Sequence, residues 1–249
     1  MNRGWVAVGL VFGFCWQCTS TTPAPIVHND VLSWRLAHEQ LQQLRQVWSP
    51  KVRSVPVRVQ MRVGDGAFEG RGAIATSPPD DLRMILVGPA GTTAMDLWVD
   101  GPRWRLAIPA ADRVSRGAGG GDGSDTKGLP VGFLRWWLLH PFEGELLAVT
   151  ENQNHILSYV LRGSDGAAYE IVAQTAGDVA IVRRHDGHVE RISASQPDCV
   201  RARYHSDSPA VALSIECDRS GTRSVPDPRA FRDPDQPVSA GVAAPDENP

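Results

Sequence analysis

Two spacings of apolar residues follow one another along the chain and predict two kinds of element. Between residues 29 and 48 apolar side chains recur at helical spacing, so we expect one amphipathic helix that ends before Pro50. We expect its apolar stripe, Val31, Trp34, Leu41, Leu44, Val47 and Trp48, to pack against a sheet. A role at a membrane surface is the alternative for this stripe.

From residue 51 onward the apolar period becomes two, which predicts strands with one solvent-exposed face. About eleven strands are expected up to residue 217, and their short connections favour antiparallel pairing. Twelve segments are candidates for these strands: 55–63, 67–76, 82–87, 92–99, 103–108, 144–151, 155–162, 167–174, 178–184, 188–194, 199–205 and 211–217. Gly70 and Gly72 suit a bend in a curling sheet.

The most apolar part of the chain after the N-terminal region is residues 128–144. Pro130 can open a helix there and Pro141 must end it, which leaves a helix of about ten residues. Its apolar side chains surround nearly the whole helix, so it must be covered on almost all sides. We therefore expect a plug against the concave face of a curved sheet. The glycine-rich residues 116–128 before it are predicted to form a flexible loop.

The two ends of the chain have compositions unlike the rest. Residues 1–18 combine a short basic start with an uncharged apolar stretch, which is typical of an export signal. Cys18 followed by the polar tether 19–28 resembles a bacterial lipoprotein signal, so Cys18 is the predicted lipid anchor. Plain secretion or an uncleaved anchor are the alternatives. Residues 219–249 are rich in Pro and Asp and are expected to be disordered or loosely packed.

The charged residues and the motifs favour no catalytic chemistry. A net charge of −3 argues against a general nucleic-acid binder. His185-Asp186-Gly187-His188 has the Asp-Gly signature of a hairpin turn rather than a metal site, and Arg183, Arg184 and Glu190 beside it are taken as exposed strand residues. Residues 123–128 lack the spacing of a phosphate-binding loop. We expect no catalytic residue, metal or cofactor.

Cys199 and Cys217 are a candidate disulfide in an exported protein. They lie symmetrically about Ser208, which favours direct opposition in a hairpin. The apolar pattern instead favours a register shifted by one residue, which would send the two cysteines to opposite faces. A bulge would reconcile the two registers, and both remain open here.

The order of these elements resembles the LolA/LolB-like superfamily of lipoprotein carriers and receptors. The resemblance lies in residues 68–75, 82–99 and 128–144 and spans 29–218 as one domain. It implies a mainly β (α+β) fold, an unclosed antiparallel barrel of about eleven strands with an N-terminal helix and a central plug. It also implies a hydrophobic cavity. The cavity candidates are Val57, Val59, Met61, Met84, Leu86, Met95, Leu97, Trp104 and Leu106. The plug or lid candidates are Phe133, Leu134, Trp137 and Leu138, and plain core packing is the alternative for all of them.

Three functions are compatible with this pattern. The first is an envelope lipoprotein that binds lipid or the acyl chains of lipoproteins, anchored at the outer membrane and facing the periplasm. The second is a structural or regulatory envelope lipoprotein that uses the same scaffold to contact other envelope proteins. The third, a hydrolase without a recognisable motif, would require a polar cluster in a cleft.

Overall fold

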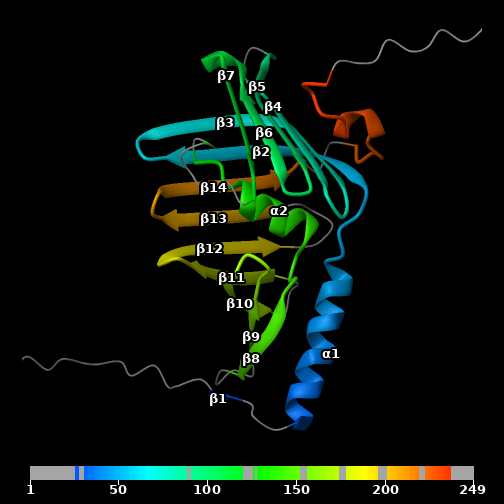
Figure 1. The fold of residues 1–249 in the computed structure, drawn as a ribbon, viewed down its shortest axis with the longest axis vertical. Helices are drawn as coiled ribbons and strands as arrows, with labels where there is room; N and C mark the ends of the chain where they lie inside the picture. Colours follow the sequence, from blue (N-terminus) through cyan, green and yellow to red (C-terminus); the bar gives the residue numbers. More distant parts are fainter. Residues whose placement is uncertain are drawn as a thin grey trace, which may run out of the picture.

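The structure is a computed structural model in which one long antiparallel sheet curls around a short helix. It describes residues 26–27, 31–88, 91–119, 126, 128–151, 156–173, 178–195, 201–218 and 222–236. Figure 1 shows helix α2 (Val131–Leu139) against the middle of one face of the sheet and helix α1 (Val31–Val47) beside one end of it. None of the described helices combines the length and the hydropathy that crossing a membrane requires.

The sheet is built from two meanders. The first comprises β2 (Arg53–Val63), β3 (Gly66–Ser77), β4 (Asp81–Val87), β5 (Thr93–Asp100), β6 (Arg103–Ile108) and β7 (Arg113–Ala118). The second comprises β8 (Glu145–Glu151), β9 (Leu157–Arg162), β10 (Ala168–Ala173), β11 (Asp178–His185), β12 (His188–Ser195), β13 (Arg201–Asp207) and β14 (Ala210–Cys217). Strand β14 pairs with β2 and joins the two meanders.

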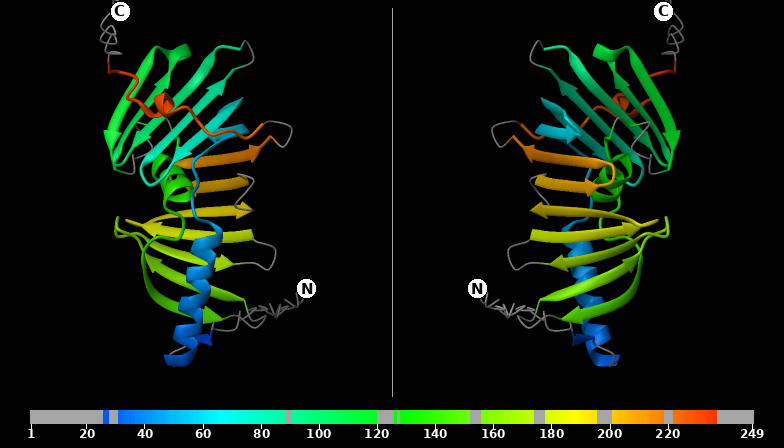
Figure 2. Two further views of the ribbon diagram at one scale, coloured as in Figure 1. Left: turned by 90° about the vertical axis from the view of Figure 1, so that its right-hand side faces the viewer. Right: turned by 90° about the vertical axis from the view of Figure 1, so that its left-hand side faces the viewer.

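The short strand β1 (Ile26–Val27) pairs with β8, so β1 and β7 are the two ends of a sheet of 14 described strands. The two ends do not pair with each other in the strand order, and Figure 2 shows the sheet curled but open. The expected unclosed, curved antiparallel sheet is therefore confirmed. The expected count of about eleven strands was too low, because β1 and β7 were not recognised.

Strand β7 corrects the prediction of a loop that begins at residue 116. Residues 113–118 pair with β6, although the segment is polar and glycine-containing. Gly117 lies against the indole of Trp104, where a Cβ atom would come within 2.5 Å of the ring. The missing side chain lets the large indole on the neighbouring strand fill this place. Residues 120–125 and 127 of the predicted loop lie outside the described part of the chain.

The register of β13 and β14 decides between the two hairpin alignments. Ala202 pairs with Ile215 and Tyr204 with Leu213, so the strands follow the apolar pattern rather than the symmetric alignment about Ser208. Cys217 is disulfide-bonded, and its partner lies outside the described residues. The pairing with Cys199 therefore stays a prediction.

Helix α1 uses only part of its predicted apolar stripe for packing. Leu41 and Trp48 are buried in the core and Leu44 packs against it. Val31, Trp34 and Val47 are exposed, which corrects their assignment to the core. The stripe therefore meets the sheet mainly through the second half of the helix.

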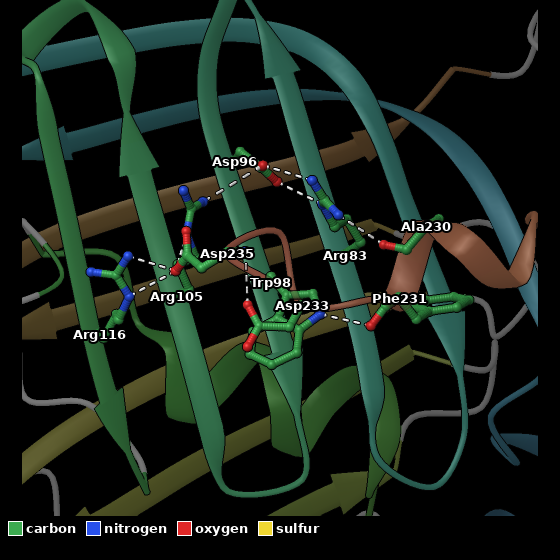
Figure 3. A network of polar contacts seen from close by, with 9 residues as sticks. All are labelled: Arg83, Asp96, Trp98, Arg105, Arg116, Ala230, Phe231, Asp233 and Asp235. Carbon is green, nitrogen blue, oxygen red and sulfur yellow. Dashed lines mark hydrogen bonds and ion pairs between the residues drawn. The ribbon is translucent and has the colours of Figure 1, made fainter. Parts of the chain in front are cut away.

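The convex face of strands β4 to β6, opposite α2, carries part of the C-terminal tail. The short helix η2 (Pro228–Phe231) lies there (Figure 3). Arg83 donates a hydrogen bond to the carbonyl oxygen of Ala230 at 2.9 Å, and the indole N–H of Trp98 donates to that of Phe231 at 2.8 Å. This part of the tail is thus held at specific points, contrary to the expectation of loose packing.

Asp235 fixes the end of the described tail. Its carboxylate accepts hydrogen bonds from Arg105 on β6 at 3.0 Å and from Arg116 on β7 at 2.8 Å (Figure 3). Arg83 in turn holds Asp96 with two hydrogen bonds of 2.8 Å. The tail crosses four neighbouring strands and binds a side chain of each.

Candidate functional site

The concave face of the sheet brings the predicted cavity and plug residues together. All nine cavity candidates lie on inward positions of β2, β4, β5 and β6, and all are buried except Met61, which is partly buried. Phe133, Leu134, Trp137 and Leu138 of α2 are buried in the same hydrophobic cluster. In this conformation the side chains of α2 occupy the face that was predicted to hold a ligand.

Helix α2 forms where its two prolines predict. It begins directly after Pro130 and ends at Leu139, two residues before Pro141. Seven of its nine residues are buried: Val131, Phe133, Leu134, Trp136, Trp137, Leu138 and Leu139. Burial of an apolar side chain contributes about 1.5–3 kcal/mol, so contact with the sheet dominates the stability of this short helix.

Aromatic contacts connect α2 to the second meander. Phe133 stacks on Tyr204 of β13 with ring centroids 4.9 Å apart, and Trp136 stacks on Tyr169 of β10 at the same distance. Phe133 and Trp137 also stack on each other, at 5.6 Å. The sequence analysis did not single out Tyr169 and Tyr204 for this site. Their inward positions in the alternating pattern of these strands could have indicated that both rings face α2.

Few polar contacts hold α2 among the described residues. The Nη1 atom of Arg135 donates a hydrogen bond to the carbonyl oxygen of Gly119 at 3.1 Å, and burial lowers the pKa of this guanidinium. The Nε atom of Arg135 and the indole nitrogens of Trp104 and Trp136 are buried without an acceptor in the described structure. The helix is thus held almost entirely by apolar surface.

The turn that follows α2 is fastened by α1. Arg45 donates hydrogen bonds to the carbonyl oxygens of Phe142 and Gly144 at 2.9 and 2.8 Å. Phe142 and Gly144 both have a positive φ, of 61° and 138°. Any Cβ atom at position 144 would come within 2.5 Å of the carbonyl oxygen of Arg162. One arginine of α1 therefore fixes the C-terminal end of the plug.

A polar pocket of about 340 Å³ opens at the other end of α2. Its walls are the start of α2, the β11–β12 hairpin and the β13–β14 hairpin. The polar side chains that line it are Arg183, His185, His188, Glu190, Tyr204, Ser206 and Ser208. The sequence analysis did not predict this pocket.

Arg183 is the centre of the polar cluster in the pocket wall. Its guanidinium binds the carboxylates of Asp165 and Glu190 at 2.9 and 2.7 Å and the hydroxyl of Tyr169 at 3.1 Å. The hydroxyl of Tyr204 donates to Glu190 at 2.8 Å. Each acidic group in the cluster therefore has a positively charged partner.

These contacts shift several pKa values. Burial alone would lower the pKa of Arg183, but Glu190, Tyr169 and Asp165 together raise it. Burial would raise the pKa of Asp165, yet the hydrogen bonds from Arg183 and from the backbone N–H of Ala167 lower it. Burial raises the pKa of Tyr169 to about 12, and burial together with the neighbouring Glu190 raises that of Tyr204. The cluster is an arginine with two carboxylates and two neutral phenols.

Two expectations for this region have different outcomes. The hairpin turn at residues 185–188 is confirmed, since His185 pairs with His188 and Asp186 and Gly187 have φ values of 48° and 79°. The reading of Arg183 and Glu190 as ordinary exposed residues is wrong, because both face inward, where they bind each other and Asp165, Tyr169 and Tyr204. The side chain of Arg183 is 21% exposed, against 53% for Arg184 on the other face.

The pocket is also the polar cluster that the hydrolase hypothesis required. Its contacts, however, tie the charged groups to one another. The ring nitrogens of His185 lie near the carbonyl oxygen of Asp165 and the carboxylate of Asp186, at 3.2 Å in each case, rather than near a serine hydroxyl. Within the described ranges, no group of three or more His, Cys, Asp or Glu residues is arranged to hold a metal ion.

A second pocket, of about 600 Å³, crosses strands β13, β14, β2 and β3. Residues of both faces of the sheet line it: outward residues such as Arg62 and Arg203, and inward residues such as Met61 and Leu213. Met61 is the one predicted cavity residue that lines either of these two pockets. The other predicted cavity residues are packed among themselves and against α2.

The chain was compared with known proteins. No protein-family model and no curated protein sequence matches it. A LolA superfamily protein from Nitrosomonas europaea has a similar structure, with 10% identity, a TM-score of 0.50, and coverage of 77% of this chain and 94% of that one.

Two further solved structures give slightly lower scores. One is a putative outer membrane lipoprotein-sorting protein domain from Vibrio parahaemolyticus, with 10% identity, coverage of 78% and 95%, and a TM-score of 0.48. The other is a DUF1329 family protein from Desulfovibrio piger, with 12% identity, coverage of 74% and 91%, and a TM-score of 0.49. The resemblance seen in the sequence is thus confirmed at the level of architecture: the chain has a LolA/LolB-like fold.

Proposed function

We propose that the protein is a non-enzymatic lipid-binding protein of the bacterial envelope, which takes up acyl chains of a lipid or lipoprotein against its concave face. The observation that carries this proposal is helix α2, an almost wholly apolar helix that fills this face with seven buried residues out of nine. An acyl chain is apolar along its length. It can therefore replace the contacts of α2 without leaving polar groups of the sheet unpaired.

Burial of an acyl chain supplies part of the free energy of such an exchange. Each CH₂ group removed from water contributes about 0.8 kcal/mol, so a chain of about 16 carbons gains on the order of 10 kcal/mol before ordering costs. Part of this gain must offset the displacement of α2. At about 1.5–3 kcal/mol for each of its seven buried residues, full exposure of α2 would cost at least as much as this gain, so the exchange requires α2 to keep most of these residues covered as it moves.

Unpaired polar atoms in the closed conformation also favour movement of α2. The indole nitrogens of Trp104 and Trp136 and the Nε atom of Arg135 are buried without an acceptor in the described structure. A buried donor without a partner costs about 1–3 kcal/mol. Displacement of α2 would expose the groups of its own Arg135 and Trp136 to solvent and recover part of that cost, which lowers the free energy of opening.

Displacement of a fluorescent fatty acid tests the proposal, together with native mass spectrometry of the purified chain. Arg45→Gln removes two hydrogen bonds that hold the end of α2. We expect this variant to bind the probe about three- to tenfold more tightly, since a larger fraction of the chain is open. Arg35→Gln, an exposed arginine on the same helix, is the matched control and should bind like the wild type.

The outcome that contradicts lipid binding is equally definite. The proposal is wrong if the purified chain carries no lipid and neither the wild type nor Arg45→Gln binds the probe. A fatty acid that bound all three proteins equally would show that α2 does not control access to the face.

Localisation in the envelope is part of the proposal and depends on the N-terminal segment. Cys18, the predicted anchor, lies outside the described residues. Labelling with radioactive palmitate should mark the wild-type chain and leave Cys18→Ser unmarked. Unlabelled wild-type protein in the soluble periplasmic fraction would favour plain secretion instead.

A second function is favoured by a specific observation. The core beneath α2 is already filled by side chains, as expected for a structural or regulatory envelope protein that contacts other proteins with this scaffold. Under this alternative α2 never leaves the sheet. Amide hydrogen exchange of α2 would then be as slow as that of the central strands and unchanged by added lipid.

A further inference from the structure

The N-terminal turns of α1 expose apolar side chains to an unusual degree. Val31, Leu32 and Leu36 are 76%, 67% and 54% exposed, and Trp34 is also exposed. Single exposed apolar residues are common on protein surfaces and need no explanation. Here four of them fall within the first six residues of one helix.

The sheet does not cover these residues because it meets the helix further along. The buried residues within α1 are Ala37 and Leu41. At about 100° per residue, Leu32 and Leu36 lie on another side of the helix than these two, whereas Trp34 lies on the same side but nearer the free end of the helix. Figures 1 and 2 both show the first turns of α1 reaching past β8 at the end of the molecule. No described segment packs over this end of the helix.

The chain enters the fold at the same place. Strand β1 lies three residues before α1 and pairs with β8, the strand that α1 contacts. Seven residues, 19–25, separate Cys18 from β1. Fully extended, they reach at most about 25 Å. A membrane that held the predicted anchor at Cys18 would therefore lie close to the start of α1.

We propose that the first turns of α1 dock into the surface of the lipid bilayer that holds the N-terminal anchor. The apolar side chains would enter the boundary between head groups and acyl chains, where tryptophan is also favoured. The first turn of α1 has no acidic residue; Asp30 precedes it, and Arg35, His38 and Glu39 follow it. The apolar side chains rather than charge therefore carry the docking.

This docking is independent of the proposed binding of acyl chains beneath α2, because it uses a different helix and no part of the concave face. Its consequence is a fixed orientation. A chain attached only through a tether of seven residues could turn freely, whereas a docked α1 holds the long axis of the sheet relative to the membrane.

Quenching by brominated lipid tests the proposal with the full, lipid-modified chain. The protein is reconstituted in vesicles of phosphatidylethanolamine and phosphatidylglycerol that contain brominated phosphatidylcholine. We expect the wild type to be quenched more than Trp34→Phe, which isolates Trp34 from the tryptophans of the concave face. Leu32→Asp/Leu36→Asp should remove this difference.

Val47→Asp is the matched control. Val47 is an exposed apolar residue at the other end of the same helix. This variant should keep the Trp34-dependent quenching, and thermal unfolding should show that both variants are folded. Equal quenching of the wild type and Trp34→Phe would overturn the proposal, as would a Val47→Asp effect as large as that of the double variant. A dimer in solution that only the double variant dissociates would also overturn it, by assigning the surface to a second copy.

Discussion

Arg183 and Arg184 are sequence neighbours in β11 with different surroundings. Arg183 faces inward, where α2 and the neighbouring strands cover it, and it binds two carboxylates. Arg184 faces outward, and its ion pair within the described ranges is with Glu170. A hydrogen bond to a charged group contributes about 1.5–3 kcal/mol when buried, whereas an exposed ion pair contributes about 0–1 kcal/mol.

Replacing these two arginines separately measures that difference. We expect Arg183→Met to lower the free energy of unfolding by about 1–3 kcal/mol, since Asp165 and Glu190 lose their charged partner in a half-buried site. Arg184→Met, the control one residue away, should change it by no more than about 0.5 kcal/mol. Urea unfolding of both variants gives the values. Equal losses would mean that the pocket wall is as well solvated as the convex face.

The tyrosines predict an alkaline transition. The chain has three, and burial raises the pKa of all of them, Tyr159, Tyr169 and Tyr204. A group whose folded-state pKa is raised stabilises the fold below its unfolded value, about 10 for tyrosine. We expect the free energy of unfolding to fall as the pH rises from there towards about 12, the pKa of Tyr169.

The near-ultraviolet absorbance of the phenolates measures this directly. In the folded chain the phenols should ionise above the ordinary pH range, and in urea all three should ionise normally. Tyr169→Phe should reduce the loss of stability in this window. Ionisation of all three groups near the ordinary value without unfolding would contradict the burial of these rings.

At the scale of elements, the local sequence pattern predicted most strands and the short helix. It missed the elements whose formation depends on packing against distant residues. The alternation in residues 53–108 predicted β2 to β6, and the two prolines predicted α2. Strand β7 was missed because Arg113, Arg116 and Gly117 lack an apolar alternation, and only pairing with β6 makes them a strand. Val31 fits the apolar stripe of α1, but it is exposed because the sheet contacts mainly the second half of the helix.

The candidate site was predictable to the same degree. Inward positions such as Leu97 follow from alternation, and their meeting with α2 follows from the need to cover an apolar helix. The Arg183 cluster was not predictable, because Asp165 lies in the turn between β9 and β10, far from Arg183 on β11 and Glu190 on β12 in sequence, and only the fold brings it to them. The contacts of the tail with Trp98 and Arg105 likewise depend on distant segments.

Gly72 sets the distance between two strands of the curled sheet. A Cβ atom there would lie 1.8 Å from the backbone carbonyl oxygen of Ile85 on β4. We expect Gly72→Ala to lower the free energy of unfolding by about 3 kcal/mol, because backbone rather than a flexible side chain must move.

Gly88→Ala is the matched control for this position. Its Cβ atom would meet its nearest neighbour at 3.6 Å, an ordinary contact, so the change should be below about 1 kcal/mol. Thermal unfolding compares the two variants. Similar midpoints would show that β3 and β4 do not approach each other this closely at Gly72.

At the scale of the whole molecule, the two faces of the sheet have different cover. Helix α2 fills the concave face through apolar contacts, and the described tail crosses the convex face through hydrogen bonds and ion pairs. Polar contacts to Arg83 and Trp98 have a defined geometry, whereas apolar contacts do not. The cover of the convex face is therefore the more specific one. Under the proposed function, the cover of the concave face is the one that an acyl chain replaces.

The order of strands also has a consequence for how the chain folds. Each meander consists of hairpins between sequence neighbours, whereas β14 meets β2 across most of the chain. Contacts between distant residues form slowly, because the loop that joins them must close first. We expect pulse-labelled amide exchange during refolding to protect β11 and β12 before β14 and β2. Simultaneous protection would indicate a single cooperative step. Earlier protection of β11 and β12 would mean that the pairing of the two meanders is the slow step, and that this step completes the concave face.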